Sequence, residues 1–397
     1  MKHLRIVLVL SEPPLPFGHA VGRWFYVLLR GLVNRGHQVR AFVICGNDHE
    51  IAQVRDLFPA PDYDVRIYAK PTRSGLWKKW QTIRRPYSYT IHPLLRTDIQ
   101  EQFQLGWDLL HLEGIWSGWL GEGFDPSKVV LNFHSLYDID QDFVPVHGVM
   151  DWLHRRVRRN AEYRLLRRYG SLLTLTTRLK RAVATIAPGT PVHVVPLGLD
   201  VSLYPFIPAE RRPLEPVVSL IGSMNWYPSY SAAIRLLTRL YPAIRHRVPN
   251  ARVEVVGWEA RKALCEHLTQ PGVTVIENVP DTRSYFERAA VFLYAPQRGS
   301  GMKVKVLEAF AYGVPVVTTA EGIEGIEARD GIHVGCSEED KGLVERVVAL
   351  LNERSRQERQ RQAARALVSR QCCPEVVLDA LEACYADILA RRERAVA

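Results

Sequence analysis

Short apolar runs alternate with longer segments of mixed polarity along most of the chain. The runs at residues 4–10, 129–133 and 290–294 are rich in Val, Leu and Phe and contain few polar residues. Runs of this length are typical of strands that are buried on both faces of a parallel sheet. The segments between them place apolar residues three and four positions apart, which predicts helices. The alternation therefore predicts an α/β protein with helices on both faces of parallel sheets.

This alternation occurs once before and once after a proline-spaced stretch at residues 204–209. Stretches of this kind are typical of linkers. A length of 397 residues also suits two domains of about 150 residues or more each. We therefore expect a first domain over residues 1–203 and a second over residues 204–375.

Composition indicates an ordinary globular protein, with 47% apolar and 24% charged residues. The six cysteines are scattered and show neither a disulfide framework nor the spacing of a zinc site. The apolar start of the chain is short and runs into Ser11-Glu12-Pro13-Pro14 without a cleavage site, so it predicts a strand and no signal peptide. No stretch approaches the ~20 apolar residues that cross a bilayer. We expect a cytoplasmic protein.

The chain carries a formal net charge of +10, and part of the excess lies in one predicted helix, His154–Arg168. Such a helix attracts phosphates of nucleic acid, of an anionic lipid surface or of a diphosphate-linked acceptor. Because no nucleic-acid-binding motif accompanies it, we expect no nucleic-acid partner. Peripheral contact with an anionic membrane surface and a solvated helix face both stay open. A second basic segment, Lys70–Pro86, is a candidate acceptor-side surface.

The stretch Arg298–Glu324 combines the features of a phosphate site. Its turn, Gly299-Ser300-Gly301, follows the apolar run at residues 290–294 and precedes a helix predicted over Met302–Tyr312. Glycines let the backbone approach a ligand, and the N–H groups at the start of a helix attract an anion. The turn is therefore a candidate phosphate-binding site.

Helical spacing places Gly301, Lys305, Glu308 and Tyr312 on the face opposite the apolar stripe of this helix. Lys305 can neutralise a diphosphate, and Glu308 can accept hydrogen bonds from a ribose diol. A solvated ion pair on an exposed helix face is the alternative. The turn also matches part of a dinucleotide-binding fingerprint, but Val304 stands where the third glycine belongs.

Two earlier strands deliver polar residues to their carboxyl ends, where ligands bind in sheets of this kind. Residues 107–114 bring His111 and Glu113 to one strand end, and residues 129–135 bring His134 to another. A histidine on a strand is often a core residue. His134 is the stronger candidate for chemistry because it comes at the very end of its strand.

The string Lys305–Val317, KVLEAFAYGVPVV, resembles the nucleotide-sugar-binding signature of retaining GT-B glycosyltransferases of family 4. A weaker likeness covers Pro191–Asp200. The resemblance implies two doubly wound Rossmann-like domains that face each other across a cleft, with the last helix, about residues 376–397, packed on the first domain. It also implies a UDP- or GDP-sugar donor.

The resemblance further implies which residues form the site. His134 contacts the donor sugar and is a predicted catalytic residue together with Lys305 and Glu308. The loop after the first strand closes over the donor, with Gly18 and Gly22 as backbone contacts and His19 and Arg23 as side-chain candidates. The donor-binding residues expected in the second domain are Gly222, Ser223, Ser300, Gly301, Met302, Lys303, Lys305, Val306 and Glu308.

Two departures from the family pattern affect this site. The family pairs two glutamates eight positions apart, whereas this chain has Ser300 opposite Glu308. The turn after residues 217–221 usually carries an arginine and a lysine that clamp the diphosphate, but here it reads Ser223-Met224-Asn225-Trp226. Lys305, with Lys303 less well placed, is expected to supply the missing charge.

The resemblance implies transfer of a sugar to a saccharide, lipid-linked or small-molecule acceptor with retention. We expect no metal ion, because no Asp-x-Asp pair lies near the turn to hold Mg²⁺. Two alternatives are a sugar-nucleotide epimerase or hydrolase of the same fold, and a nucleotide-sugar-binding protein that has lost turnover.

Overall fold

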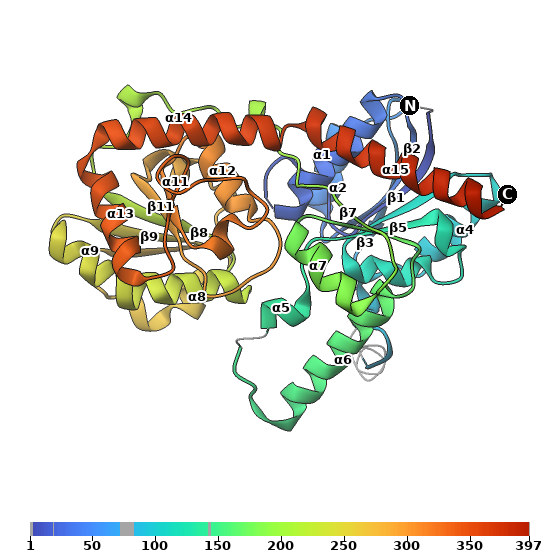
Figure 1. Cartoon of the computed structure of the whole chain (residues 1–397), viewed down its shortest axis with the longest axis horizontal. Helices are drawn as coiled ribbons and strands as arrows, with labels where there is room; N and C mark the ends of the chain where they lie inside the picture. The colour runs from blue at the N-terminus through green and yellow to red at the C-terminus, as the bar shows by residue number, and fades with distance from the viewer. Residues whose placement is uncertain (1–2, 19, 72–82, 142–143, 397) are drawn as a thin grey trace. The chain divides into compact units, whose positions relative to one another are not determined.

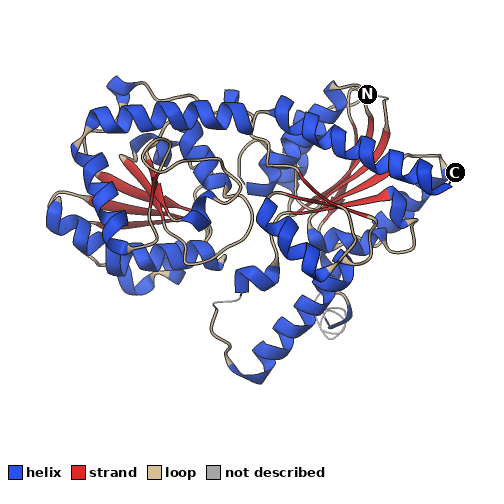
Figure 2. Ribbon diagram, viewed as in Figure 1, coloured by secondary structure: helices blue, strands red, loops and turns tan. Residues whose placement is uncertain are grey.

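The computed structural model describes residues 3–18, 20–71, 83–141 and 144–396. The chain divides into two units, each with one parallel sheet between helices (Figure 1, Figure 2). The first unit comprises Met1–Asp138, Val144–Gly198 and Pro374–Ala397, and the second comprises Ile139–Phe143 and Leu199–Cys373. The predicted α/β architecture with two Rossmann-like sheets is confirmed. The division between the units falls at Gly198, a few residues before the predicted boundary.

The first unit is built on a seven-stranded sheet with strand order β3-β2-β1-β4-β5-β6-β7. Its strands are β1 (Arg5–Leu10), β2 (Gln38–Cys45), β3 (Asp64–Ala69), β4 (Leu109–Glu113), β5 (Val129–Phe133), β6 (Ser171–Thr174) and β7 (Val192–Val194). All of these pair in parallel. The order reverses between β1 and β4, so the loops after these two strands diverge and leave a crevice at their carboxyl ends.

Helices cover both faces of this sheet (Figure 2). The α-helices are α1 (Ala20–Asn34), α2 (Asp48–Leu57), α4 (Leu95–Gln104), α6 (Gly148–Leu166), α7 (Thr177–Ile186) and α15 (Pro374–Val396), with α5 (Tyr137–Gln141) at the division between the units. Short 3-10 turns lie at Ser88–Thr90, Ile115–Gly121 and Pro126–Lys128. Helix α1 forms because Phe25, Leu28 and Leu32 recur at helical spacing, and all three are buried.

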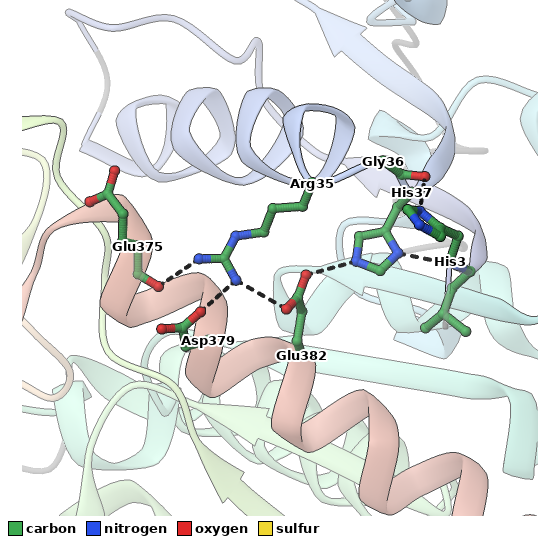
Figure 3. A network of polar contacts seen from close by, with 8 residues as sticks. His3, Arg35, Gly36, His37, Glu375, Asp379 and Glu382 are labelled. Carbon is green, nitrogen blue, oxygen red and sulfur yellow. Dashed lines mark hydrogen bonds and ion pairs between the residues drawn. The ribbon is translucent and has the colours of Figure 1, made fainter. Parts of the chain in front are cut away.

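The final helix α15 packs on α1, as the resemblance implied, and a polar network fixes this contact (Figure 3). Arg35 donates to Asp379 Oδ1 at 2.6 Å, to Glu382 Oε2 at 3.0 Å and to the carbonyl of Glu375 at 2.8 Å. The ring of His37 accepts from the N–H of Leu4 through Nδ1, so its Nε2–H donates to Glu382 at 2.9 Å. His37 therefore has a structural role.

The second unit is built on a six-stranded parallel sheet with strand order β10-β9-β8-β11-β12-β13. Its strands are β8 (Val217–Ile221), β9 (Arg252–Gly257), β10 (Val273–Glu277), β11 (Val291–Tyr294), β12 (Val316–Thr318) and β13 (Gly335–Cys336). Here the order reverses between β8 and β11. The turns after these two strands, at Gly222 and at Gly299, therefore flank the crevice in which such sheets bind ligands.

The helices of the second unit are α8 (Tyr227–Arg235), α9 (Tyr241–Arg247), α10 (Ala260–Ala263), α11 (Arg283–Arg288), α12 (Val304–Tyr312), α13 (Asp340–Asn352) and α14 (Arg354–Gln371). A π-helical turn at Leu236–Leu240 joins α8 to α9, and short 3-10 turns lie at Val201–Leu203, Ala209–Arg211, Cys265–His267 and Ala320–Ile323. The sequence predicts one outer helix over residues 339–362. The structure instead breaks it at Glu353, whose extended backbone ends α13 before α14 begins.

Residues 204–209, predicted to be a linker, are packed into the second unit. Tyr204 is buried and its ring meets that of Tyr312 edge-on. Arg361 donates to the carbonyl of Ile207, and Arg365 donates to the carbonyl of Tyr204. Two arginines of α14 thus anchor this stretch, so the linker prediction from proline spacing was wrong.

The cysteines are all free. Among the described residues, no helix combines the length and the apolar character that crossing a bilayer requires.

Candidate functional site

The turn Gly299–Lys303 and helix α12 form the centre of the candidate site in the second unit. Gly301 has φ +75°, which favours glycine, and Lys303 has an extended backbone, so the helix begins at Val304 and not at Met302 as predicted. Gly313 ends the helix in the left-handed conformation with φ +72°, as its position in the sequence indicates. The turn lies directly beyond β11, at the crevice of the sheet.

Lys303 stabilises this turn from within. Its ammonium donates to the carbonyls of Ser300 at 3.2 Å and of Gly301 at 2.5 Å, and the residue is 1% exposed. Its charge is therefore bound to the turn's own carbonyls. The expectation that Lys303 is less well placed than Lys305 for a ligand stays a prediction, and these contacts give a physical reason for it.

Lys305 projects from α12 toward the turn after β8. Its Nζ donates to Oγ of Ser229 at 2.5 Å and lies 4.6 Å from the ring centre of Tyr294 and 5.0 Å from that of Trp226. Burial, and to a smaller extent the charge of Lys303, lower the pKa of Lys305 to about 7, while the charge of Glu308 opposes this shift. The charged form of such a buried ammonium is stabilised when an anion binds beside it. The solvated ion pair on an exposed face is not what the structure shows.

The turn after β8 fits around this ammonium. A Cβ added to Gly222 would lie 2.6 Å from Nζ of Lys305 and 2.9 Å from Oγ of Ser229. A larger residue at this position would therefore displace the lysine ammonium or the serine hydroxyl. Ser223, the next residue, is exposed beside it. The structure thus brings Gly222 and Ser223 together with Lys305.

Three other predicted donor-binding residues lie in or next to α12. Glu308 is 5% exposed and lies one helical turn from Lys305, whose charge it favours. Met302 is buried. Val306 is fully buried, and its N–H already donates to the carbonyl of Lys303 at 2.9 Å. Val306 therefore offers a ligand neither its side chain nor its N–H, which corrects its assignment as a donor contact.

Asp140 contacts the turn of the candidate site, which its position in the sequence does not indicate. Its Oδ1 accepts from the N–H and from the hydroxyl of Ser300, both at 2.7 Å, and the side chain of Trp226 also donates to this carboxylate. Burial raises the pKa of Asp140, while these hydrogen bonds and the charge of Lys303 oppose the shift. Ser300 stands where the family has a glutamate, and the carboxylate that contacts it lies 160 positions away in the sequence.

The crevice of the first unit holds a second cluster, around Glu113 at the end of β4. Its carboxylate is fully buried and accepts from His134 Nε2 at 2.8 Å, from Trp24 Nε1 at 3.1 Å and from Asn132 Nδ2 at 3.0 Å. His111 Nε2 lies 3.1 Å away. Burial alone would raise the pKa of Glu113, but the hydrogen bonds from His111 and His134 hold it well below its usual range. The carboxylate is therefore ionised.

The glycines predicted in the loop after β1 differ in their surroundings. Gly18 is exposed with φ +101°, and a Cβ there would meet nothing within 4 Å. Gly22 is buried at the start of α1, where a Cβ would lie 2.7 Å from the carbonyl oxygen of Pro13. Gly22 thus serves to pack the helix against its own loop. Arg23 is buried, and His19 lies outside the described residues.

The predicted site residues thus form two groups. Gly222, Ser223, Lys305 and the turn from Ser300 to Lys303 meet in the second unit, while His134 lies in the first. Within the described part of the chain, no group of three or more His, Cys, Asp or Glu side chains is arranged to hold a metal ion. Of the basic segment Lys70–Pro86, residues 72–82 lie outside the described residues.

Two family models match this chain, one in each half of the sequence. The family model described as Glycosyltransferase Family 4 matches residues 21–203, and the model described as Glycosyl transferases group 1 matches residues 215–353. No curated protein matches the sequence.

Solved structures share the fold over nearly the whole chain. Sucrose-phosphate synthase from Thermosynechococcus elongatus has a TM-score of 0.68 at 15% identity, covering 99% of this chain and 100% of that one. HepE from Anabaena, solved with UDP and glucose, has a TM-score of 0.66 at 14% identity, covering 96% and 100%. WaaG, a glycosyltransferase involved in lipopolysaccharide biosynthesis, has a TM-score of 0.63 at 16% identity, covering 94% and 98%. The family models together with this fold show that the chain belongs to the family-4, group 1 glycosyltransferases of GT-B fold.

Proposed function

We propose that the chain transfers a sugar from a UDP- or GDP-sugar to a saccharide, lipid-linked or small-molecule acceptor, with retention and without a metal ion. Sugar transfer itself follows from the family. The observation that carries the finer proposal is the position of Lys305, whose ammonium lies against Gly222 at the crevice between β8 and β11. This is where a diphosphate belongs in such a sheet.

The reaction requires stabilisation of a departing diphosphate. The bond from the anomeric carbon to the diphosphate oxygen breaks, a bond to the acceptor oxygen forms, and the proton of the acceptor hydroxyl goes to the departing diphosphate. A preorganised cation in a water-poor site stabilises the charge that develops on the leaving group. Lys305 supplies this cation, which is the task of a metal ion in other transferases. Glu308 is suited to the ribose diol and His134 to the donor sugar.

Neighbouring structures support a nucleotide-sugar donor and a saccharide acceptor. HepE was solved with UDP-glucose as well as with UDP and glucose. TarM from S. aureus was solved with UDP and alpha-GlcNAc-glycerol. These proteins are only 10–14% identical to this chain, so their ligands indicate a class of donor and acceptor and no particular sugar.

Incubation with single nucleotide-sugars, with and without candidate acceptors, tests the proposal. A new glycoside with the anomeric configuration of the donor, formed in the presence of EDTA, is the expected product. Release of free sugar or of an isomerised sugar without acceptor would favour the hydrolase or epimerase alternative. Donor binding without any product would favour a protein that has lost turnover.

We also propose that the protein is cytoplasmic and that it makes peripheral contact with an anionic membrane surface. The N-terminal half of α6 is the proposed contact surface. The C-terminal part of the basic stretch is engaged within the first unit. Arg158 donates to the hydroxyl of Tyr137, Arg164 to the carbonyl of Arg84 and Arg167 to the carbonyl of Ile186. These arginines are therefore structural, and the remaining contact surface lies toward the start of the helix.

That start exposes an unusual group of apolar side chains. Val149 is 78% and Met150 63% exposed, and Val146, Trp152 and Leu153 are also exposed. Val149, Met150 and Leu153 lie on one side of the helix, and Arg156 lies over the ring of Trp152. Figure 1 shows this part of α6 projecting away from the sheet of its unit. Apolar and aromatic residues flanked by arginines are typical of helices that lie in a membrane interface.

Sedimentation with vesicles tests this contact. The chain should bind phosphatidylcholine vesicles that contain phosphatidylglycerol more strongly than vesicles without it, and the triple substitution V149D/M150D/L153D should abolish binding. Leu94→Asp and Leu214→Asp, at exposed apolar positions elsewhere, are controls that should bind normally. Unchanged vesicle binding by the triple variant would contradict the proposal. The proposal would also be contradicted if the native chain were a dimer on size-exclusion chromatography and the triple variant a monomer. In that case a second copy of the chain, and not a membrane, would cover this face.

A further inference from the structure

Glu113 is a buried carboxylate that receives donors from several directions. Trp24 reaches it from α1, Asn132 from β5 and His134 from the residue that follows β5. Asn132 stands opposite Glu113 in the register of β4 and β5, and its amide lies 3.0 and 3.2 Å from the two carboxylate oxygens. Pairing of neighbouring strands therefore builds this cluster at the crevice of the first sheet.

An ionised carboxylate without solvent is costly unless its oxygens are satisfied. Neutral donors such as the indole and the amide can be satisfied by a neutral acceptor as well. A carboxylate does more for an imidazole, because its negative charge strengthens the hydrogen bond from the ring N–H and so favours the tautomer that points this N–H at it. Among the described residues that contact Glu113, His111 and His134 have such a ring.

The two histidines differ in their second contact. His111 is fully buried, and its Nδ1 is paired with the hydroxyl of Tyr385 from α15 at 2.5 Å. His134 has a side chain that is 15% exposed, and its Nε2 points at Glu113. Because Nε2 donates to the carboxylate, the neutral form of this ring has its lone pair on Nδ1. His134 is thus prepared to accept a hydrogen bond through Nδ1.

We propose that Glu113 is a positioning residue for sugar transfer: it holds His134 in the Nε2–H tautomer, so that Nδ1 accepts a hydrogen bond from a hydroxyl of the donor sugar. The inference rests on the proposed function, because it takes His134 to contact the sugar. In this proposal Glu113 does not contact the sugar, and its effect on transfer comes from its hydrogen bond with His134.

The test uses the full chain with Glu113→Gln, which keeps the size of the side chain and removes its charge. Glu162→Gln is the matched control, since Glu162 is also buried in the first unit and accepts from the N–H of Tyr137. Should Glu113→Gln fail to fold, Glu113→Asp, which keeps the charge and shortens the reach, takes its place.

Two readouts separate positioning from a purely structural role. The first is the tautomer of His134, read from long-range ¹⁵N couplings in the NMR spectrum. We expect the Nε2–H form in the native chain and in Glu162→Gln, and a larger share of the Nδ1–H form in Glu113→Gln, because a neutral amide favours the Nε2–H form less strongly and can also donate to the ring. A native His134 in the Nδ1–H form, or an unchanged tautomer in Glu113→Gln, would overturn the proposal whether or not a donor has been identified.

The second readout is a double-mutant cycle in the transfer assay. Glu113→Gln should lower kcat about tenfold in the native background, in line with loss of one oriented hydrogen bond. It should have no further effect in a His134→Ala background, because its action passes through that ring. Additive losses would overturn the positioning role. An altered tautomer in a chain that proves to have no transferase activity would instead show that the proposed function has failed.

Discussion

Ser300 donates both its backbone N–H and its hydroxyl to one carboxylate oxygen of Asp140, each at 2.7 Å. The family pattern places a glutamate at position 300, and this chain lacks it. Asp140, which belongs to the second unit through the segment Ile139–Phe143, brings a carboxylate to the same turn. A carboxylate from a distant part of the chain thus contacts the residue that departs from the family pattern.

If Asp140 takes the place of the missing glutamate, it should recognise the donor sugar and not the nucleotide. We expect Asp140→Ala to weaken binding of the nucleotide-sugar about tenfold, the range of one hydrogen bond to a charged group, and to leave binding of the free nucleoside diphosphate unchanged. Calorimetry with both ligands measures the difference. Asp138→Ala, whose carboxylate accepts from Tyr163, is the control. Tighter binding of both ligands to Asp140→Ala would contradict this role. It would show that the Asp140 carboxylate repels the diphosphate and does not bind the sugar.

Alanine substitution of the two lysines of the site should have different effects, mainly on catalysis for Lys305 and mainly on stability for Lys303. Lys305→Ala removes the cation that faces the leaving diphosphate, so we expect a loss of at least ~100-fold in kcat. Lys303→Ala should lose less in kcat and more in melting temperature, because its ammonium binds the turn carbonyls of Ser300 and Gly301. Equal and mild effects of the two substitutions on kcat would refute the assignment of Lys305.

The lowered pKa of Lys305, about 7, gives a pH-dependent signature. The unfolded chain keeps the ordinary value of 10.5, so between about pH 7 and 10 it binds a proton that the folded chain has released. This group's contribution therefore makes the fold more stable as the pH rises through that window. Lys305→Met should abolish this increase, which melting curves at several pH values can measure. A pH dependence that is the same in both proteins would contradict the shifted pKa.

A bound donor should reverse this shift, because the diphosphate favours the ammonium form. At pH 8.5 we expect uptake of about one proton on nucleotide-sugar binding, and at pH 6 almost none, since Lys305 is then already charged. Calorimetry in buffers of different ionisation enthalpy measures the uptake. Uptake that persists in Lys305→Ala would assign the proton to another group.

Gly222 offers a test of geometry that leaves every charge in place. An added Cβ would meet Nζ of Lys305 at 2.6 Å, so Gly222→Ala should displace the ammonium and weaken nucleoside diphosphate binding while the chain stays folded. Gly170→Ala, whose Cβ would approach its neighbours no closer than 3.4 Å, is the control. Normal donor binding by Gly222→Ala would mean that Lys305 does not bind the diphosphate from its present position.

Local patterns predicted the parts of the molecule that depend on nearby residues. The buried strands at residues 4–10 and 290–294 appear as β1 and β11, and Gly313 ends α12 as expected. Helical spacing alone predicted that Lys305 is better placed than Lys303 to face a ligand, because the 3.6-residue period fixes which residues share a face of the helix. The carboxyl ends of the strands likewise indicated His134 and Glu113.

Contacts between distant residues could not be read in this way. Nothing near Asp140 in the sequence indicates its bond to Ser300, and nothing near Tyr204 shows that arginines of α14 bind the backbone of the supposed linker. Hydrogen bonds to backbone carbonyls leave no periodic pattern. For the same reason the internal use of Lys303, and of the Val306 N–H, appears only in the structure.

The central claim is that Lys305 binds the diphosphate of a nucleotide-sugar, and a thermal-shift panel on native chain and Lys305→Ala tests it most directly. The panel contains UDP, GDP, ADP and dTDP, their common sugar conjugates, and NAD. A ligand at about 100 times its Kd should stabilise the native fold by ~2.7 kcal/mol. We predict stabilisation by one nucleoside diphosphate and its conjugates, lost in Lys305→Ala. Stabilisation by NAD alone, or an equal shift in both proteins, would contradict the claim.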